Sequence, residues 1–371
     1  MESNNLSNIK DSMKQNFITY LVVSMILIFV ILTILYIIYL TKLQDKECSY
    51  MNDMYGSLDG NIKSISMTDE DCSGNFNEYY IKTAYNACSG GSYKNDFVNI
   101  CNLKAVLKQG VRGLDFEIYS IDNQPVVATS TADNYYIKET YNYVNFSEVM
   151  STIKNYAFSQ STAPNPLDPI VIHLRFMTNN QSMYTNLANI FKSYDDVLLG
   201  KEYSFENSGH NIGDEKLRDF MSKIILMVDR SNNSFIENKE LLEFVNLTSG
   251  SMFMRAYHYF DVKNNPDLEE LREYNKKNLT IVFPDHGTDP PNASGLLCRD
   301  AGCQMVAMRY QYVDNFLLEN ALFFDRCSYA FCLKPERLRY KLVTVPDAIP
   351  QDPALSYETR DVSSDFYNFK I

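Results

Sequence analysis

The chain has 371 residues with 45% hydrophobic content, which is enough for one large domain with a substantial core. Its formal net charge of −12 argues against a nucleic-acid-binding protein and against nonspecific adsorption to anionic lipid headgroups. Tryptophan is absent, whereas Asn, Ile and Lys are plentiful, as in proteins of AT-rich genomes such as those of large DNA viruses or protists.

An uncharged apolar stretch, residues 18–40, predicts one transmembrane helix, because about twenty apolar residues cross a bilayer core. A polar tail, residues 1–17, precedes it. The stretch is too long for a secretory signal peptide, and no small-residue cleavage site follows it. Lysines flank both ends, so the flanking charges do not decide the orientation.

All eight cysteines lie on the C-terminal side of this stretch, which predicts disulfides in an oxidising compartment; reduced cysteines in the core are the alternative. Cys298 and Cys303, joined by a short polar loop, are one candidate pair. Cys327 and Cys332 are less expected to pair, because an odd separation along a strand points them to opposite faces. Zinc is not expected, since these spacings are not those of zinc ligands.

Asn-X-Ser/Thr sequons are compatible with the same compartment; they begin at Asn145, Asn180, Asn232, Asn246, Asn278 and Asn292. We therefore expect a single-pass protein whose C-terminal domain lies on the extracytoplasmic, lumenal or virion-exterior side.

A polar connector, residues 41–78, leads into a region where strand-like and helix-like stretches alternate, as in a parallel α/β fold. Predicted strands cover residues 111–119, 169–175, 223–228, 279–283 and 304–310. Predicted helices cover residues 97–109, 146–158, 181–194, 237–244 and 267–277. A linker, residues 201–216, divides the region into halves at 79–200 and 217–340, and a tail, residues 341–371, is expected to be extended.

The strand at residues 111–119, VRGLDFEIY, is the most informative element. Its alternation turns Leu114, Phe116 and Ile118 to one face and puts Asp115 and Glu117 on the other. Two carboxylates so close are costly unless water, a metal or a fixed cation lies between them. The strand is therefore either an exposed edge with a wet acidic face or a barrel strand with an inward acid pair.

Several segments in order resemble the X and Y halves of the eukaryotic phosphoinositide-specific phospholipase C barrel. They are YYIKTAYNA at 79–87, the strand at 111–119, QPVVATS at 124–130, PIVIHLR at 169–175 and GCQMVA…LKPERLR at 302–339. The last block is the most specific. The resemblance implies a TIM-type (β/α) barrel of the PLC-like phosphodiesterase kind over residues 79–340.

The resemblance also implies a reaction that uses two histidines, and neither is present. Tyr85 stands at the position of the first histidine and Thr129 at that of the second. A tyrosine hydroxyl with an ordinary pKa near 10 is a poor proton shuttle at neutral pH, and threonine cannot serve as one.

Three of the four calcium-ligand positions implied by the resemblance keep plausible ligands: Asn86, Asp115 and Glu117. At the fourth, Arg175 replaces an acidic residue. A guanidinium repels a cation, but it could occupy the same space and pair with both carboxylates. We therefore expect no bound metal, and Arg175 in direct contact with at least one of the two acids.

The substrate-phosphate positions have also lost the residues that the resemblance implies. The lysine positions hold Met227 and Asp229, the arginine position Ile281 and the tyrosine position Phe283. Among the four histidines, His173 is expected to be a satisfied core residue, while His258 and His286 fall near predicted strand ends.

The sequence thus predicts a membrane-anchored, phospholipase C-like pseudoenzyme with a binding or structural role in a viral or cellular membrane. Its partners would be the bilayer, through residues 18–40, and a protein on the barrel surface, with no nucleic acid and no cofactor. The alternative is an active phosphoric diester hydrolase with altered catalytic residues, for which calcium would be the cofactor.

Overall fold

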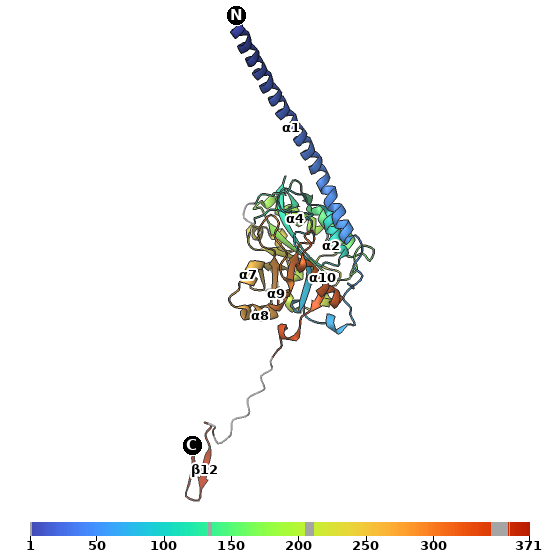
Figure 1. Ribbon diagram of the computed structural model, residues 1–371. Helices are drawn as coiled ribbons and strands as arrows, with labels where there is room; N and C mark the ends of the chain where they lie inside the picture. Colours follow the sequence, from blue (N-terminus) through green and yellow to red (C-terminus); the bar gives the residue numbers. More distant parts are fainter. Residues whose placement is uncertain (1, 133–135, 205–210, 343–354, 356) are drawn as a thin grey trace. The chain divides into compact units, whose positions relative to one another are not determined.

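The computed structural model describes residues 2–132, 136–204, 211–342, 355 and 357–371. The chain divides into a main unit, Met1–Arg339, and a short C-terminal unit, Tyr340–Ile371 (Figure 1). Part of the expected linker at 201–216 lies outside the described residues.

Eight parallel strands form a nearly closed barrel in the main unit, which confirms the predicted TIM-type fold. Their spatial order is β7-β6-β5-β2-β1-β10-β9-β8. The bounds are β1 Tyr79–Ala84, β2 Gly113–Ile121, β5 Ile170–Phe176, β6 Ile224–Asp229, β7 Leu247–Ser249, β8 Met254–His258, β9 Leu279–Phe283 and β10 Met305–Met308. Between their described residues the two end strands, β7 and β8, are in contact but share no hydrogen-bonded ladder.

Helices cover the outside of the barrel (Figure 1). They are α2 Ile100–Lys108, α3 Phe146–Ala157, α4 Gln181–Lys192, α6 Lys239–Leu242, α7 Tyr259–Lys263, α8 Leu268–Lys277, α9 Gly295–Asp300 and α10 Asn315–Cys327. Outward side chains of the strands, such as Leu114 and Phe116, pack with helix residues such as Leu103 and Phe146 in one buried cluster. Inward side chains, such as Val171 and Ile281, belong to a second buried cluster.

Short elements complete the barrel. β3 (Gln124–Ala128) folds back on β2 as a hairpin, because Asp122 and Asn123 adopt positive φ at the turn. β4 (Val144–Asn145) pairs with β3, and β11 (Phe331–Leu333) pairs antiparallel with β1. The 3-10 turns are η1 Glu70–Cys72, η2 Phe76–Glu78, η3 Lys201–Tyr203, η4 Ile212–Asp214, η5 Leu217–Phe220, η6 Ser234–Glu237 and η7 Glu336–Leu338.

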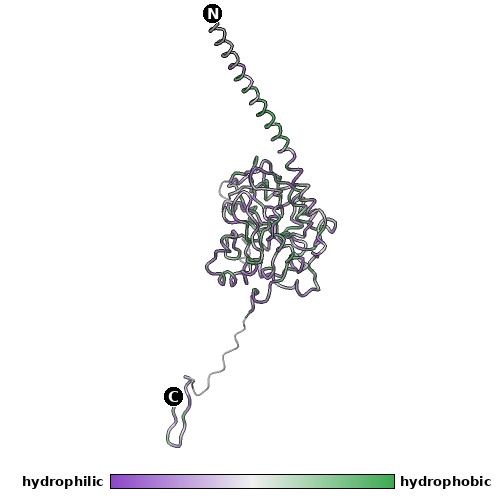
Figure 2. Tube along the Cα trace, in the orientation of Figure 1, coloured by the Kyte–Doolittle hydropathy of each residue, from purple (hydrophilic) through white to green (hydrophobic). Residues whose placement is uncertain are grey.

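Helix α1 runs from Glu2 to Tyr55, so the expected polar tail and the start of the expected connector are helical as well. The part at Asn16–Tyr55 is long and apolar enough to cross a membrane, and its apolar stretch is the green run in Figure 2. Near the C-terminal end of α1, Met51 is buried in the cluster that contains α2.

The C-terminal unit contains a hairpin rather than only an extended tail. β12 (Asp361–Ser364) pairs antiparallel with β13 (Tyr367–Lys370). Cross-strand pairs such as Val362 with Phe369 set its register. The expectation of a merely extended tail is therefore wrong for this hairpin.

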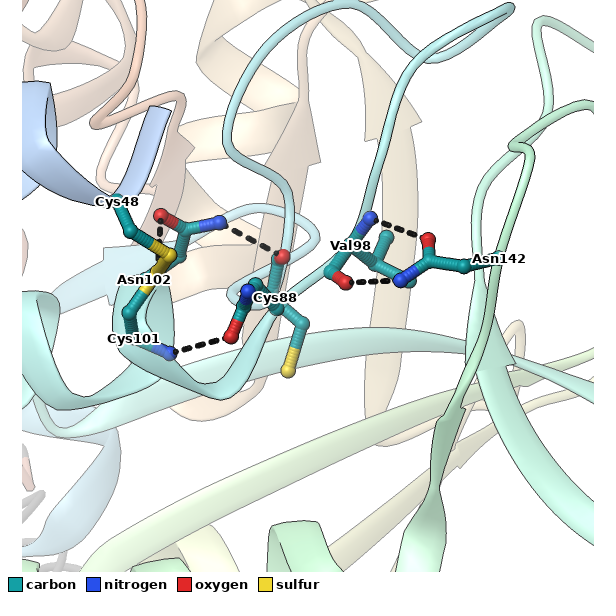
Figure 3. Close-up of a disulfide and its surroundings, with 7 residues drawn as sticks. Cys48, Cys88, Val98, Cys101, Asn102 and Asn142 are labelled. Carbon is teal, nitrogen blue, oxygen red and sulfur yellow. Dashed lines mark hydrogen bonds between the residues drawn. A yellow bond between two sulfur atoms is a disulfide. The ribbon is translucent and has the colours of Figure 1, made fainter. Parts of the chain in front are cut away.

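Two disulfides form, Cys48–Cys101 (Figure 3) and Cys327–Cys332, which confirms disulfide bonding but not the candidate pair Cys298–Cys303. Cys298 and Cys303 are buried free thiols. Cys327 and Cys332 can pair because they do not share one strand: Cys327 ends α10 and Cys332 lies in β11. Ser328 between them adopts a left-handed conformation that turns the chain back.

Candidate functional site

The inward acid pair lies on β2 beside β5, at the carboxyl-terminal mouth of the barrel. Asp115 is paired in register with His173, and Glu117 with Arg175. All four side chains are buried. The alternation of β2 turns its apolar residues toward the helices, so both carboxylates face inward as the sequence predicts.

Both carboxylate oxygens of Asp115 accept hydrogen bonds. Oδ1 accepts from His173 Nδ1 at 2.9 Å and from Arg175 Nε at 3.1 Å. Oδ2 accepts from Arg175 Nη2 at 2.9 Å and from the backbone amide of Asn86 at 3.3 Å. His173 Nε2 lies 3.0 Å from Ser249 Oγ, which confirms His173 as a satisfied core histidine.

Glu117 is equally well satisfied. Oε1 accepts from Asn86 Nδ2 at 2.9 Å and lies 3.2 Å from Arg175 Nη2. Oε2 accepts from the Tyr119 hydroxyl at 2.8 Å and from the backbone amide of Ser130 at 3.0 Å. Tyr119 shares the inward face of β2 by alternation, whereas no sequence signal singled out the Ser130 amide.

Arg175 joins the two acids, and its direct contact with both confirms the geometric prediction. Nη2 also donates to Asn86 Oδ1 at 3.1 Å. The guanidinium carbon lies 4.7 Å from the ring centroid of Tyr85 and 5.2 Å from that of Phe283. The cation is thus held by oxygen acceptors and by aromatic rings.

The charges in this cluster compensate each other. Burial by itself raises the pKa of Asp115, but the Arg175 charge and the hydrogen bonds from His173 and Arg175 outweigh it. The pKa of Asp115 therefore lies below its usual range, and its charged form is favoured.

This arrangement does not fit a calcium ion. A calcium site needs six to eight oxygen ligands with free lone pairs directed at the metal. Here each oxygen of Asp115 and Glu117 already has protein donors, and the Arg175 guanidinium lies between them. Within the described part of the chain, no group of three or more His, Cys, Asp or Glu side chains could hold a metal ion.

The two positions implied for histidines hold buried packing residues. The Tyr85 ring packs against Tyr93 and Phe283, with centroids 5.5 and 5.6 Å apart. Thr129 Oγ1 donates to the backbone carbonyl of Tyr93 at 3.1 Å. Neither side chain is among the usual general bases of enzymes at neutral pH.

The positions implied for substrate phosphates are likewise apolar or acidic. Met227 and Ile281 are fully buried inside the barrel. Asp229 ends β6, and its Oδ1 accepts from the backbone amide of Ser231 at 2.6 Å. No cation replaces the implied lysines at Met227 and Asp229.

A pocket of about 370 Å³ opens beside the cluster, and no pattern in the sequence indicates it. Its lining comes from the ends of β5, β6, β8 and β9 and includes Arg175, Asp229, Arg230, Tyr257, His258 and Phe283. His258 Nδ1 lies 2.7 Å from the carbonyl oxygen of Pro284, an acceptor that fixes the ring proton on Nδ1. Its ring stacks on His286 with centroids 3.9 Å apart.

Comparison with known proteins points to the same family as the sequence motifs. Residues 72–230 match the model of the phosphatidylinositol-specific phospholipase C X domain. No curated protein matches the chain.

Among solved structures, PLC21 from L. pealei matches with 19% identity and a TM-score of 0.59. PLC21 from S. officinalis matches with 20% identity and a TM-score of 0.58. Each match covers 72% of this chain but only 38% of the matched chain, and identities this low show the fold alone. The X-domain match over residues 72–230 and the barrel topology both agree with the resemblance to phosphoinositide-specific phospholipase C seen in the sequence.

Proposed function

We propose that this protein is a membrane-anchored member of the family that has exchanged hydrolysis for a binding or structural role. The observation that carries the proposal is the Arg175 guanidinium, which contacts Asp115 and Glu117 where the family resemblance implies a metal ligand. Such a buried ion cluster closes part of the barrel mouth without a metal.

The residues at the implied catalytic and phosphate-binding positions also support the proposal. A phosphodiester hydrolase needs a base to activate the nucleophile and an acid to protonate the leaving group. Tyr85 and Thr129 stand where the resemblance implies these groups, and both are buried among other side chains. The implied phosphate-binding lysines are replaced by Met227 and Asp229.

Membrane anchoring is the second part of the proposal, and α1 supplies its basis. Residues 18–40 carry no charge, and all those side chains are exposed or nearly so on the isolated protein. Apolar side chains left bare along about 30 Å of helix are stable in a bilayer rather than in water. The two disulfides support an extracytoplasmic, lumenal or virion-exterior barrel, because disulfides persist in oxidising compartments.

The pocket beside the cluster supports a binding role over a purely structural one. Its volume of about 370 Å³ is that of a small-ligand site, and charged and aromatic side chains line it.

The second candidate function is hydrolysis of a phosphodiester by different residues, and His258 favours it. Its ring lines the pocket, and histidine is the usual general base near neutral pH.

The test is inositol phosphate release by full-length protein in vesicles that contain phosphatidylinositol, with calcium or with a chelator. We expect no release above that from protein-free vesicles in either condition. Calcium-dependent release that Asp115→Asn abolishes would overturn the proposal. Calcium-independent release that is lost in His258→Ala but kept in a His210→Ala control would establish the second candidate instead.

A further inference from the structure

Six Asn-X-Ser/Thr sequons lie in the barrel region, residues 79–340, and their asparagine side chains differ in what they do for the fold. The sequons begin at Asn145, Asn180, Asn232, Asn246, Asn278 and Asn292. An N-linked glycan is bulky and polar and belongs on a surface. A sequon that carries one therefore needs a side-chain amide that points into solvent and holds no part of the fold.

Three of the asparagines are buried and do not meet this condition. Asn232, Asn246 and Asn292 are 5%, 2% and 1% exposed. Asn232 Nδ2 donates to the carbonyl of Phe176 at 3.1 Å, and Asn292 Nδ2 donates to the carbonyl of Tyr312 at 2.9 Å. A sugar on any of these nitrogens would have to be accommodated inside a packed interior, which has no room for it.

Two more asparagines are half-buried, and their amides are turned toward the protein. Asn180 Nδ2 donates to Ser120 Oγ at 2.9 Å and to Asn123 Oδ1 at 2.7 Å, while its Oδ1 caps the first turn of α4. Asn278 lies between α8 and β9, and its Nδ2 donates to the carbonyl of Tyr274 at 3.4 Å. A glycan on either nitrogen would compete with these contacts.

Asn145 is the exception, because its backbone is fixed while its side chain is exposed. It ends β4 and occupies the N-cap position of α3, yet its side chain makes no cap hydrogen bond. The neighbours Val144 and Phe146 are buried in the core, whereas Asn145 and Ser147 are both exposed. The two polar residues of this sequon therefore face solvent, and its middle residue anchors the segment.

The attachment reaction changes little at such a position. The amide nitrogen forms a bond to the anomeric carbon of an oligosaccharide that is carried on a lipid pyrophosphate. The bond from that carbon to the pyrophosphate oxygen breaks, the lipid pyrophosphate leaves with the electron pair, and the nitrogen loses one proton. Since the Asn145 side chain does not cap α3, the exchange of one N–H for a sugar breaks no bond at the start of the helix.

We infer that Asn145 is the sequon of the barrel region that carries an N-linked glycan, and that the other five asparagines stay unmodified. The inference rests on the proposed extracytoplasmic side of the barrel, because sequons are glycosylated in proteins of the secretory route.

The test is enzymatic removal of the glycan from full-length protein made in a cell that glycosylates in its endoplasmic reticulum. Peptide N-glycosidase should give one discrete mobility shift, and peptide mass spectrometry should place the released glycan at Asn145. We expect Asn145→Gln and Ser147→Ala to abolish the shift. Ser147→Thr keeps a sequon and should keep the shift, as should the matched control Asn180→Gln.

A separate variant distinguishes failure of this site from failure of the proposed sidedness. Gln160→Asn creates a new sequon at an exposed position in the turn after α3. If that variant gains a glycan while Asn145 has none, the inference is overturned and the extracytoplasmic barrel stands. If neither position is modified, the sidedness and the inference both fail. A glycan found at any of the other five asparagines would also overturn the inference.

Discussion

The two sides of the barrel mouth differ in the surroundings of their charged side chains. On the β1–β2–β5 side, Asp115 and Glu117 are buried and each contacts the buried Arg175 guanidinium. On the β6–β8–β9 side, Asp229 and Arg230 border an open pocket of about 370 Å³. The side that the family resemblance associates with metal and acid–base chemistry is packed into the core, while the other side is hollow.

Charged side chains on the two sides of the mouth therefore depend on their protein partners to different degrees. The ion cluster has to be complete, because each buried charge depends on its partners. Groups around the open pocket can exchange a protein partner for water at little cost. Substitutions should therefore be costly on the first side and tolerated on the second.

The largest expected effect is that of Arg175→Met. Removing the guanidinium leaves Asp115 and Glu117 buried without their cation, which should lower the free energy of unfolding by about 3–5 kcal/mol. Arg230→Met on the open side is the matched control and should change the free energy of unfolding by less than about 0.5 kcal/mol. Denaturant unfolding of both variants measures this contrast, and equal losses would remove the distinction between the two sides.

A smaller loss of stability is expected for Asp115→Asn, and this loss should depend on pH. The folded-state pKa of Asp115 is lowered from 3.8, so its contribution is present above that value and lost as the pH falls through the folded pKa. Asp115→Asn should cost about 1–3 kcal/mol at neutral pH and flatten the loss of stability in acid. The control Asp229→Asn should lose stability in acid as the wild type does. The same flattening in both variants would contradict the role assigned to Asp115.

The smallest expected loss of stability comes from the removal of one hydroxyl group. Tyr119→Phe removes the donor to Glu117 Oε2 and should cost about 1 kcal/mol, the usual contribution of one buried hydrogen bond. Tyr257→Phe, in the open pocket, should leave the thermal midpoint unchanged because water can solvate its surroundings. An unchanged midpoint in Tyr119→Phe would show that Glu117 does not need this donor.

Much of the barrel could be predicted because its signals are local. The alternation in β2 fixes which face Asp115 and Glu117 occupy, and the motifs around β1, β2 and β5 place Arg175 beside them. The apolar run in β6 marks a strand covered on both faces. These features depend on neighbours within a few residues or on ordered motifs.

Other features depend on where distant segments meet, which one sequence does not encode locally. The Cys48–Cys101 pair requires α1 to continue past the apolar stretch and lie along α2. The Cys327–Cys332 pair requires the turn at Ser328. The pocket beside His258 arises from four separate strand ends.

The most direct test of the central claim is calcium-dependent stability. Thermal unfolding of the wild type and of Arg175→Glu is compared with millimolar calcium and with a chelator. With Arg175 in the implied metal position, the wild-type midpoint should be the same in both, whereas Arg175→Glu should be destabilised in the chelator and recover at least partly in calcium. A saturable calcium stabilisation of the wild type that Asp115→Asn abolishes would contradict the account.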